Sequence, residues 1–482
     1  MKSLKSIIGN KVLLYLISRY FTYGIQFIGF LILSAKMGPY HYGRWGFFLM
    51  IISYFTIINF GIQNSTDILL VQNKNDKTKE KDYVASAMIA CCILAALVFV
   101  IATLYFFKPI AIFEKYKIGN LFYVICVIAI FHYFTFVFGK IYRIKNRLFE
   151  LAFNQTLLPV TIIICACLFE GERLFNVLVV GYLGVTVFAF LLFVLRGAIP
   201  FGGKPNKPFL LEIIKKGFFL FLYNSCFYLI LTTTSTIVSN FYTVGEYGYY
   251  TFSYSLGHSV LMLMEALTYV VFPKIVSRFY TGTIDEVRST IKALRTNYVS
   301  LSHGLMYVAF AFFPLLIKLF PKYESALPAL CITGLAVLLN TNSFGFNTYL
   351  IAKNDEKVIS GISVVSLIAN ICIGLAIAYL HFPFYCVVLS IICSYLLFAY
   401  LCAKRAMKKI FNEVSTRQTI LAVFPSSLFI PFVTGILIVA YNLYMLSFLP
   451  LIVFIIFNIS SVKEICLTAK TVINNPNVID LK

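Results

Sequence analysis

The sequence has few charged residues for its length, and acidic residues are especially scarce. Only 12% of its 482 residues are charged, and Asp and Glu together number 19. About a quarter of the residues in a soluble globular protein are charged. No predicted loop exceeds about 25 residues, which leaves no room for a separate catalytic or nucleotide-binding domain. The composition therefore excludes an ordinary soluble enzyme.

Several motifs of cofactor chemistry are also absent. The 12 cysteines form no CxxC pair with a matching His or Cys pair, so we expect them to be buried apolar side chains. The Gly-rich segment 197–203 has no following Lys-Ser/Thr and is not a phosphate-binding loop. The sequence thus predicts neither a metal site nor a cofactor. The net charge of +21 could indicate nucleic acid, but the basic residues lie in short loops and form no soluble basic module.

What the sequence does contain is apolar residues, at 60% of the chain. A membrane-spanning helix needs about 20 mostly apolar residues, and helices satisfy every backbone amide within lipid. We therefore predict an all-α polytopic membrane protein with about 14 spans. The predicted spans are 12–35, 44–65, 83–107, 119–139, 153–169, 174–196, 215–240, 248–272, 295–320, 327–350, 357–380, 382–403, 418–441 and 443–460.

The distribution of basic residues gives this arrangement an orientation. With a cytoplasmic N-terminus, the predicted inner segments carry 31 of the 40 Lys and Arg residues, and the outer segments carry 8. Cytoplasmic loops of membrane proteins are enriched in Lys and Arg, so both termini are expected in the cytoplasm. The first apolar run, which extends to about residue 35, is too long for a cleavable signal peptide. We expect a multi-pass membrane protein.

A short internal repeat suggests two similar halves. Tyr42-Gly43 and Tyr247-Gly248 lie 205 residues apart, each in the outer loop between the first two spans of a six-span half. Halves with an even number of spans run in parallel, an arrangement of transporters that place substrate between the halves. The predicted divisions are a six-helix lobe over 1–200, a second over 201–410, and two further helices with a tail over 411–482.

Polar residues at helical spacing are concentrated in the first two spans of each half. Interhelical hydrogen bonding would explain single residues, whereas the whole pattern favours a hydrated central cavity. Arg19 and Glu265 each lie about seven residues inside the inner end of a span, which is roughly 10 Å deep. We expect them to face each other across the cavity; the alternative for Arg19 is that it extends to the inner interface.

Three segments resemble one family of exporters. They are MGPYHYGRWGFF with NFGIQNSTD (Ala35–Asp67), KKGFFLFLYNS with SNFYTVGEYGYY (Lys215–Tyr250), and VVFPKIV (Val270–Val276). Together they resemble the Wzx-type flippases of O-antigen and polysaccharide repeat units. These flippases share a superfamily with the multidrug MATE exporters and the lipid II flippase.

The resemblance implies alternating access and an undecaprenyl-diphosphate-linked oligosaccharide, of O-antigen or capsule, moved from the inner to the outer leaflet. It also implies that the protein lies in the bacterial inner membrane. Its partners would be membrane lipids and a polysaccharide polymerase. Candidate ion-coupling residues are Asp67, His258 and Glu265. The candidate substrate-binding residues are Arg19, Gln26, Gln63, Asn224, Tyr228, Glu265 and Asn340, with Arg44 and Lys216 at helix ends.

Two other functions are compatible with this size and hydropathy. The first is a cation-coupled multidrug exporter of the same architecture, which a cavity of carboxylates and aromatic rings would favour. The second is a membrane polysaccharide polymerase or ligase, whose sugar chemistry usually requires a large outer loop. The predicted outer loops here are short, and an arginine in the cavity favours an anionic substrate.

Overall fold

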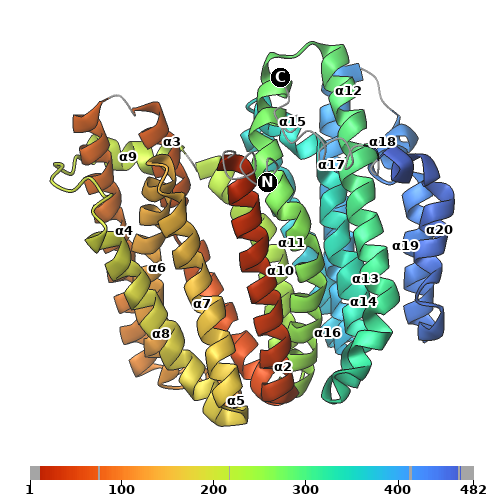
Figure 1. Ribbon diagram of the computed structural model, residues 1–482, viewed down its shortest axis with the longest axis horizontal. Coiled ribbons are helices and arrows are strands. Elements are labelled where there is room, and N and C mark those ends of the chain that lie inside the picture. Colours follow the sequence, from red (N-terminus) through yellow and green to blue (C-terminus); the bar gives the residue numbers. More distant parts are fainter. Residues whose placement is uncertain (1–10, 74–75, 217, 412–414, 465–466, 468–482) are drawn as a thin grey trace, which may run out of the picture. The chain divides into compact units, whose positions relative to one another are not determined.

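A computed structural model describes residues 11–73, 76–216, 218–411, 415–464 and 467, shown in Figure 1. The described residues form helices and turns and contain no strand. The chain divides into two compact units. The first comprises Met1–Ser225 with Tyr242–Gly248, and the second comprises Cys226–Phe241 with Tyr249–Lys482. The all-α fold predicted from the sequence is therefore confirmed.

The first unit is built around α6, which packs against α2, α3, α4, α7 and α8. Aromatic and aliphatic side chains fill its interior, including Phe138 and Tyr142, because a long apolar helix can bury its whole circumference only among other helices. The helices of this unit are α2 (Lys11–Ile57), α3 (Ile62–Gln72), α4 (Lys77–Phe107), α5 (Ala111–Lys115), α6 (Leu121–Ile144), α7 (Leu148–Leu168), α8 (Gly171–Leu195) and α9 (Lys207–Lys216).

Helix α2 contains the first predicted span and the first part of the second, joined by a bend. Gly38 has φ 69° and ψ 169°, and Pro39 follows it. A positive φ favours glycine because it has no Cβ, and the proline that follows disfavours the α conformation before it. The chain changes direction here, so the regular helix on each side is close to the length predicted for one span.

The second unit has α14 and α17 at its core, and both are largely buried. Its helices, with short 3-10 and π turns (η) between them, begin with α10 (Phe218–Phe241), which starts in the first unit. They continue with α11 (Val244–Thr281), α12 (Ile284–Leu294), η1 (Arg295–Val299), α13 (Ser300–Lys318), η2 (Pro321–Ala326), α14 (Leu327–Leu339), η3 (Asn340–Ser343), α15 (Phe346–Ala352), α16 (Glu356–Tyr379), η4 (Phe384–Val388), α17 (Leu389–Phe411), α18 (Thr416–Val423), α19 (Ser426–Ala440), η5 (Tyr444–Leu446) and α20 (Leu449–Phe457).

The count of 14 spans is not confirmed. Ten helices among the described residues are long and apolar enough to cross a membrane, or eleven if the bent pair α18–α19 is one span. One reason for the difference is that α2 combines the first two predicted spans in one continuous element. At the other end, Tyr444–Phe457 is apolar but shorter than a spanning helix.

The boundary between the units differs from the predicted boundary at residue 200. The linker that follows α8 packs on the N-terminal end of α4, where the backbone N–H of Lys204 donates to Asp82 Oδ1 at 2.7 Å. Helix α9 continues this contact, since Tyr83 OH donates to Glu212 Oε2 at 2.6 Å and the Tyr83 ring lies 4.4 Å from that of Phe209. The amphipathic helix α9 therefore belongs to the first unit, and the division lies within α10.

A buried amide joins α10 to α16 in the second unit. Asn370 is fully buried, and its Nδ2 lies 3.0 Å from three acceptors: the carbonyl oxygen of Ile230 and the hydroxyls of Thr233 and Thr234. Threonines at consecutive positions of α10 thus replace water around a polar group inside an apolar bundle. Polar side chains commonly join helices in this way within membranes.

Replacing Asn370 by Ala should destabilise the second unit. The change leaves two threonine hydroxyls and one carbonyl without this donor, so we expect the free energy of unfolding to fall by about 1–2 kcal/mol. Unfolding of the purified protein in mixed micelles would measure the difference. Asn240→Ala, at an exposed position of the same helix α10, is the matched control and should change stability little. Equal stability of both variants would contradict the assigned role of Asn370.

Candidate functional site

The second predicted span is broken at residues 58–61, between α2 and α3. Phe60 and Gly61 have φ of 49° and 73°, outside the helical region. The side chain of Asn59 replaces the lost helical hydrogen bonds: its Nδ2 donates to the Thr56 carbonyl and its Oδ1 accepts from Gly61 N–H, both at 2.7 Å. Irregular backbone at membrane depth occurs where it is buried in protein or lines a cavity. Broken helices of this kind form substrate and ion sites in transporters.

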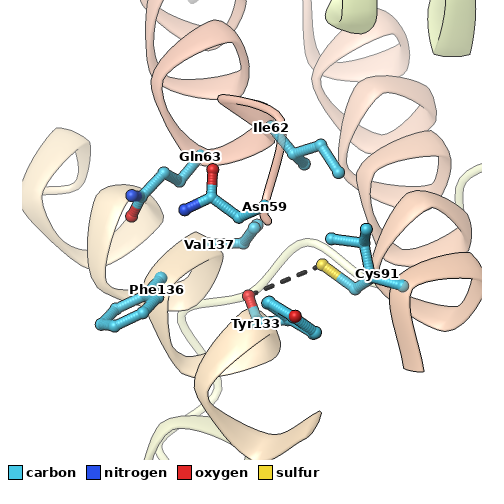
Figure 2. A pocket seen from close by; sticks show the side chains of 8 residues that line it. Asn59, Ile62, Gln63, Cys91, Tyr133, Phe136 and Val137 are labelled. Atoms are coloured by element: carbon cyan, nitrogen blue, oxygen red, sulfur yellow. Dashed lines mark hydrogen bonds between the residues drawn. The ribbon is translucent and has the colours of Figure 1, made fainter. Parts of the chain in front are cut away.

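A small cavity adjoins this break, and its wall is shown in Figure 2. Its free volume of about 10 Å³ is close to that needed by one water molecule. Cys91 Sγ donates to the Tyr133 carbonyl at 3.6 Å, and Tyr133 OH donates to the Phe55 carbonyl at 2.9 Å. The lining residues are Asn59, Ile62, Gln63, Cys91, Leu94, Tyr133, Phe136 and Val137. Asn59 and Gln63 supply amide groups to an otherwise mostly apolar wall.

A cluster of charged residues lies beyond the break. It includes Asp67, which is one turn after Gln63 on α3. Asp67 forms an ion pair with Arg143 of α6, with side chains 16% and 33% exposed respectively. Beside it, Lys145 pairs with Glu80 at 3.3 Å, and Lys140 lies one turn before Arg143. Three cations thus accompany two carboxylates. Among the described residues, Asp67 Oδ1 is buried and accepts no hydrogen bond. The excess positive charge suits an anionic headgroup.

Arg19 lies on α2 and contacts α7 within the first unit. Its Nε donates to Tyr23 OH at 3.1 Å, its Nη1 donates to Gln155 Oε1, and its guanidinium lies 5.0 Å from the centre of the Tyr23 ring. One turn further, the hydroxyls of Thr22 and Thr156 are 3.2 Å apart. Arg19 is half-buried, and these bonds use two of its five N–H donors. The guanidinium is therefore fixed by two side chains and retains donors for an anion.

In the second unit, α11 brings together two residues predicted to serve ion coupling. His258 Nε2 lies 3.4 Å from Glu265 Oε1, because residues seven apart lie on the same face of a helix. Half of the Glu265 side chain is exposed. Arg19 and Glu265 thus each have partners in their own unit, and the expectation that they face each other remains a prediction.

The other predicted site residues occupy different environments. Gln26, Asn224, Tyr228 and Asn340 are exposed, and Gln63 is half-buried at the cavity. The side chain of Lys216 lies outside the described residues. Arg44 is only 4% exposed; its Nε donates to the Tyr116 carbonyl at 3.0 Å and its Nη1 pairs with Glu172 at 3.3 Å. This geometry favours a structural role for Arg44.

The sequence analysis missed a second broken region, in the second unit. Arg295, the first residue of the predicted span 295–320, lies in the π turn η1. It donates to the Asn342 carbonyl at 2.9 Å and the Val423 carbonyl at 2.7 Å, where α14–η3 and α18 end. His303 Nε2 lies 2.9 Å from Asn342 Oδ1. A cation at the carbonyl ends of two helices stabilises their dipoles. No signal in the sequence pairs positions so far apart.

Comparison with known proteins identifies a related family and fold. Residues 8–279, more than half of the chain, match the sequence model of a family described as polysaccharide biosynthesis protein. None of the curated proteins compared matches the chain.

Among solved structures, the lipid II flippase MurJ in an inward closed conformation is similar at a TM-score of 0.67 and 14% identity, covering 93% of this chain and 98% of that one. An inward-facing multidrug resistance MATE family transporter of the MOP superfamily gives 0.64 and 12%, covering 82% and 98%. A eukaryotic MATE transporter gives 0.55 and 12%, covering 89% and 98%. At these identities the likeness establishes the fold.

The pairing of Asp67 with Arg143 can be tested by a double-mutant cycle. Because each single change, Asp67→Asn or Arg143→Gln, leaves a partly buried charge without its partner, we expect each to lower the free energy of unfolding by about 1–2 kcal/mol. The double variant should lose less than the sum. The control is the exposed pair Arg288–Asp285, at 3.0 Å, whose coupling should be at most about 0.5 kcal/mol. Strict additivity for Asp67 and Arg143 would show that the pair does not stabilise the protein.

Proposed function

Because the chain belongs to the polysaccharide biosynthesis protein family, we propose that it is a flippase for a lipid-linked oligosaccharide. The substrate is an undecaprenyl-diphosphate-linked repeat unit of O-antigen or capsule. The protein moves this headgroup from the cytoplasmic to the outer leaflet of the bacterial inner membrane by alternating access. Both termini lie in the cytoplasm. The family and the fold shared with flippases and exporters support transport rather than an enzymatic reaction.

The physical task of such a protein is to replace the water around the headgroup. A diphosphate with attached sugars cannot enter hydrocarbon without hydrogen-bonding and charged partners. No covalent bond changes, so the residues need only bind, orient and release the substrate. The lipid tail can remain in the membrane throughout.

Arg19 is the observation that carries this proposal. It is a cation in the first predicted span that is oriented by Tyr23 and Gln155 and is not neutralised by a carboxylate among the described residues. A guanidinium stays charged and presents paired N–H donors that match a phosphate. Arg19 is therefore assigned to the diphosphate. The exposed amides and hydroxyl of Gln26, Asn224, Tyr228 and Asn340, with Gln63, are assigned to sugar hydroxyls.

A cation-coupled multidrug exporter is the second candidate, since the chain is similar to a multidrug transporter to nearly the same degree. Its cargo would call for carboxylates, and Glu265, which lies beside His258 on α11, is a half-exposed carboxylate. The orientation of Arg19 favours an anionic cargo instead. Cells lacking the protein separate the two functions: a flippase leaves lipid-linked repeat units on the inner leaflet, whereas an exporter leaves the cells drug-sensitive with normal surface glycan.

Reconstituted protein should flip the lipid-linked repeat unit in proteoliposomes. Because Arg19→Ala removes the phosphate contact, we expect an at least tenfold lower initial rate, equivalent to about 1.4 kcal/mol. Arg19→Lys keeps the charge and loses the paired donors, so its rate should be intermediate. Arg147→Ala, which removes an exposed arginine, is the control. An unchanged rate in Arg19→Ala would remove the residue from the substrate site.

Ion coupling can be measured in the same vesicles. If Glu265 and His258 exchange a proton during transport, Glu265→Gln should abolish the response of flipping to an imposed pH gradient while downhill flipping continues. Asp285→Asn, at a 90% exposed position, should respond like the parent protein. A normal gradient response in Glu265→Gln would exclude this pair as the coupling site.

A further inference from the structure

A stripe of exposed and half-buried residues runs along one face of α17 in the second unit. Its members follow one another at intervals of three or four positions, so they lie on the same side of the helix. The stripe, called here the α17 stripe, consists of Cys393, Leu397, Tyr400, Lys404, Lys408 and Phe411. The predicted span 382–403 is the twelfth from a cytoplasmic N-terminus, so its end is predicted to be inner. The α17 stripe thus changes from apolar to cationic at the predicted inner surface.

The inner end of α17 carries four cations but contacts a single carboxylate among the described residues. Arg405 and Lys409 both pair with Asp355 Oδ2, and Arg405 Nε lies 3.8 Å from it. Lys404 and Lys408 are exposed and pair with no carboxylate in the part of the chain that the structure describes. Like charges four residues apart on a helix repel each other. The α17 stripe therefore presents two cations that a bound anion would stabilise.

The position of these lysines near a helix end does not account for their arrangement. A helix dipole favours cations only in the last turn, and Lys404 lies two turns before Phe411, the last residue of α17. The enrichment of inner loops in basic residues selects no particular face of a helix. Here Lys404 continues the apolar face, and its Nζ lies 5.9 Å from the centre of the Tyr400 ring. Tyrosine is enriched where a membrane meets water, so Tyr400 marks the level of the headgroups.

We propose that the α17 stripe binds an anionic phospholipid of the inner leaflet. The lipid phosphate lies between the ammonium groups of Lys404 and Lys408. One acyl chain follows Tyr400, Leu397 and Cys393 toward the centre of the bilayer. Basic residues directly cytoplasmic of a membrane helix attract anionic lipids in this way. The inference does not rest on the proposed transport function, because lipid binding can be measured without substrate.

Photo-crosslinking tests this site with the full-length protein reconstituted in phosphatidylcholine vesicles. The probe is phosphatidylglycerol that carries a diazirine in one acyl chain, and mass spectrometry maps and quantifies the labelled positions. We expect labelling within residues 393–400. Lys404→Gln combined with Lys408→Gln should lower it at least about fivefold, because each basic residue near the surface strengthens the attraction. Lys404→Arg combined with Lys408→Arg keeps both charges and should retain the labelling, which separates loss of charge from loss of fold.

Lys77→Gln combined with Lys81→Gln is the matched control, since it removes two exposed lysines at the same spacing from α4. Three carboxylates lie beside these lysines in the chain, namely Asp76, Glu80 and Asp82. This control should leave the labelling of α17 unchanged. Equal labelling by a diazirine phosphatidylcholine, or unchanged labelling in the α17 glutamine variant, would overturn the lipid site. So would displacement of the probe by the lipid-linked repeat unit, because the α17 stripe would then belong to the substrate.

Discussion

The structure depends on one constraint: a backbone amide or carbonyl inside lipid must have a hydrogen-bond partner supplied by the protein. The backbone groups inside a long helix bond to one another, so partners from elsewhere are needed only where a helix stops. At the first unit's break, Asn59 supplies both a donor and an acceptor from one side chain. At the second unit's breaks, Arg295 supplies two donors to the carbonyls of Asn342 and Val423.

The same constraint explains why the polar residues lie where they do. The break at Asn59 adjoins a mostly apolar cavity with two amide groups in its wall, and the ion pair of Asp67 and Arg143 joins two of the helices that line this cavity, α3 and α6. Arg19, on α2, is oriented by a neighbouring helix in the same way. Each unit thus holds charged side chains in defined local networks. The proposed transport function would benefit from this order, because a charged group that reoriented freely would lose side-chain entropy on every binding event.

The sequence was sufficient for the features that follow from local pattern. Apolar length predicted the helical membrane fold, and helical spacing placed His258 and Glu265 on one face of α11. It could not reveal pairings such as Asp67 with Arg143, 76 residues apart, since only packing brings them together. Arg295 was expected at the start of the predicted span 295–320, but no local pattern indicated the π turn in which it lies or the two carbonyl oxygens that it binds. The span count exceeded the ten or eleven helices that qualify, partly because hydropathy separates the two arms of α2.

Gly43 and Gly248 make a reciprocal contact within the first unit: a Cβ added to Gly43 would overlap the Val244 carbonyl oxygen, and a Cβ added to Gly248 would overlap the Pro39 carbonyl oxygen. The same offset of 205 residues relates the two contacts. This has a consequence for how such a chain can arise. When residue pairs exchange under a constant sequence offset, the contact has the form of an isologous interface between identical subunits. A surface of that kind is self-complementary, so one half of the chain already carries what it needs to bind a second copy of itself. Duplication and fusion would preserve the fit at once. Later substitutions at Gly43 or Gly248 would then be constrained by a neighbour on the other copy, as at a dimer axis.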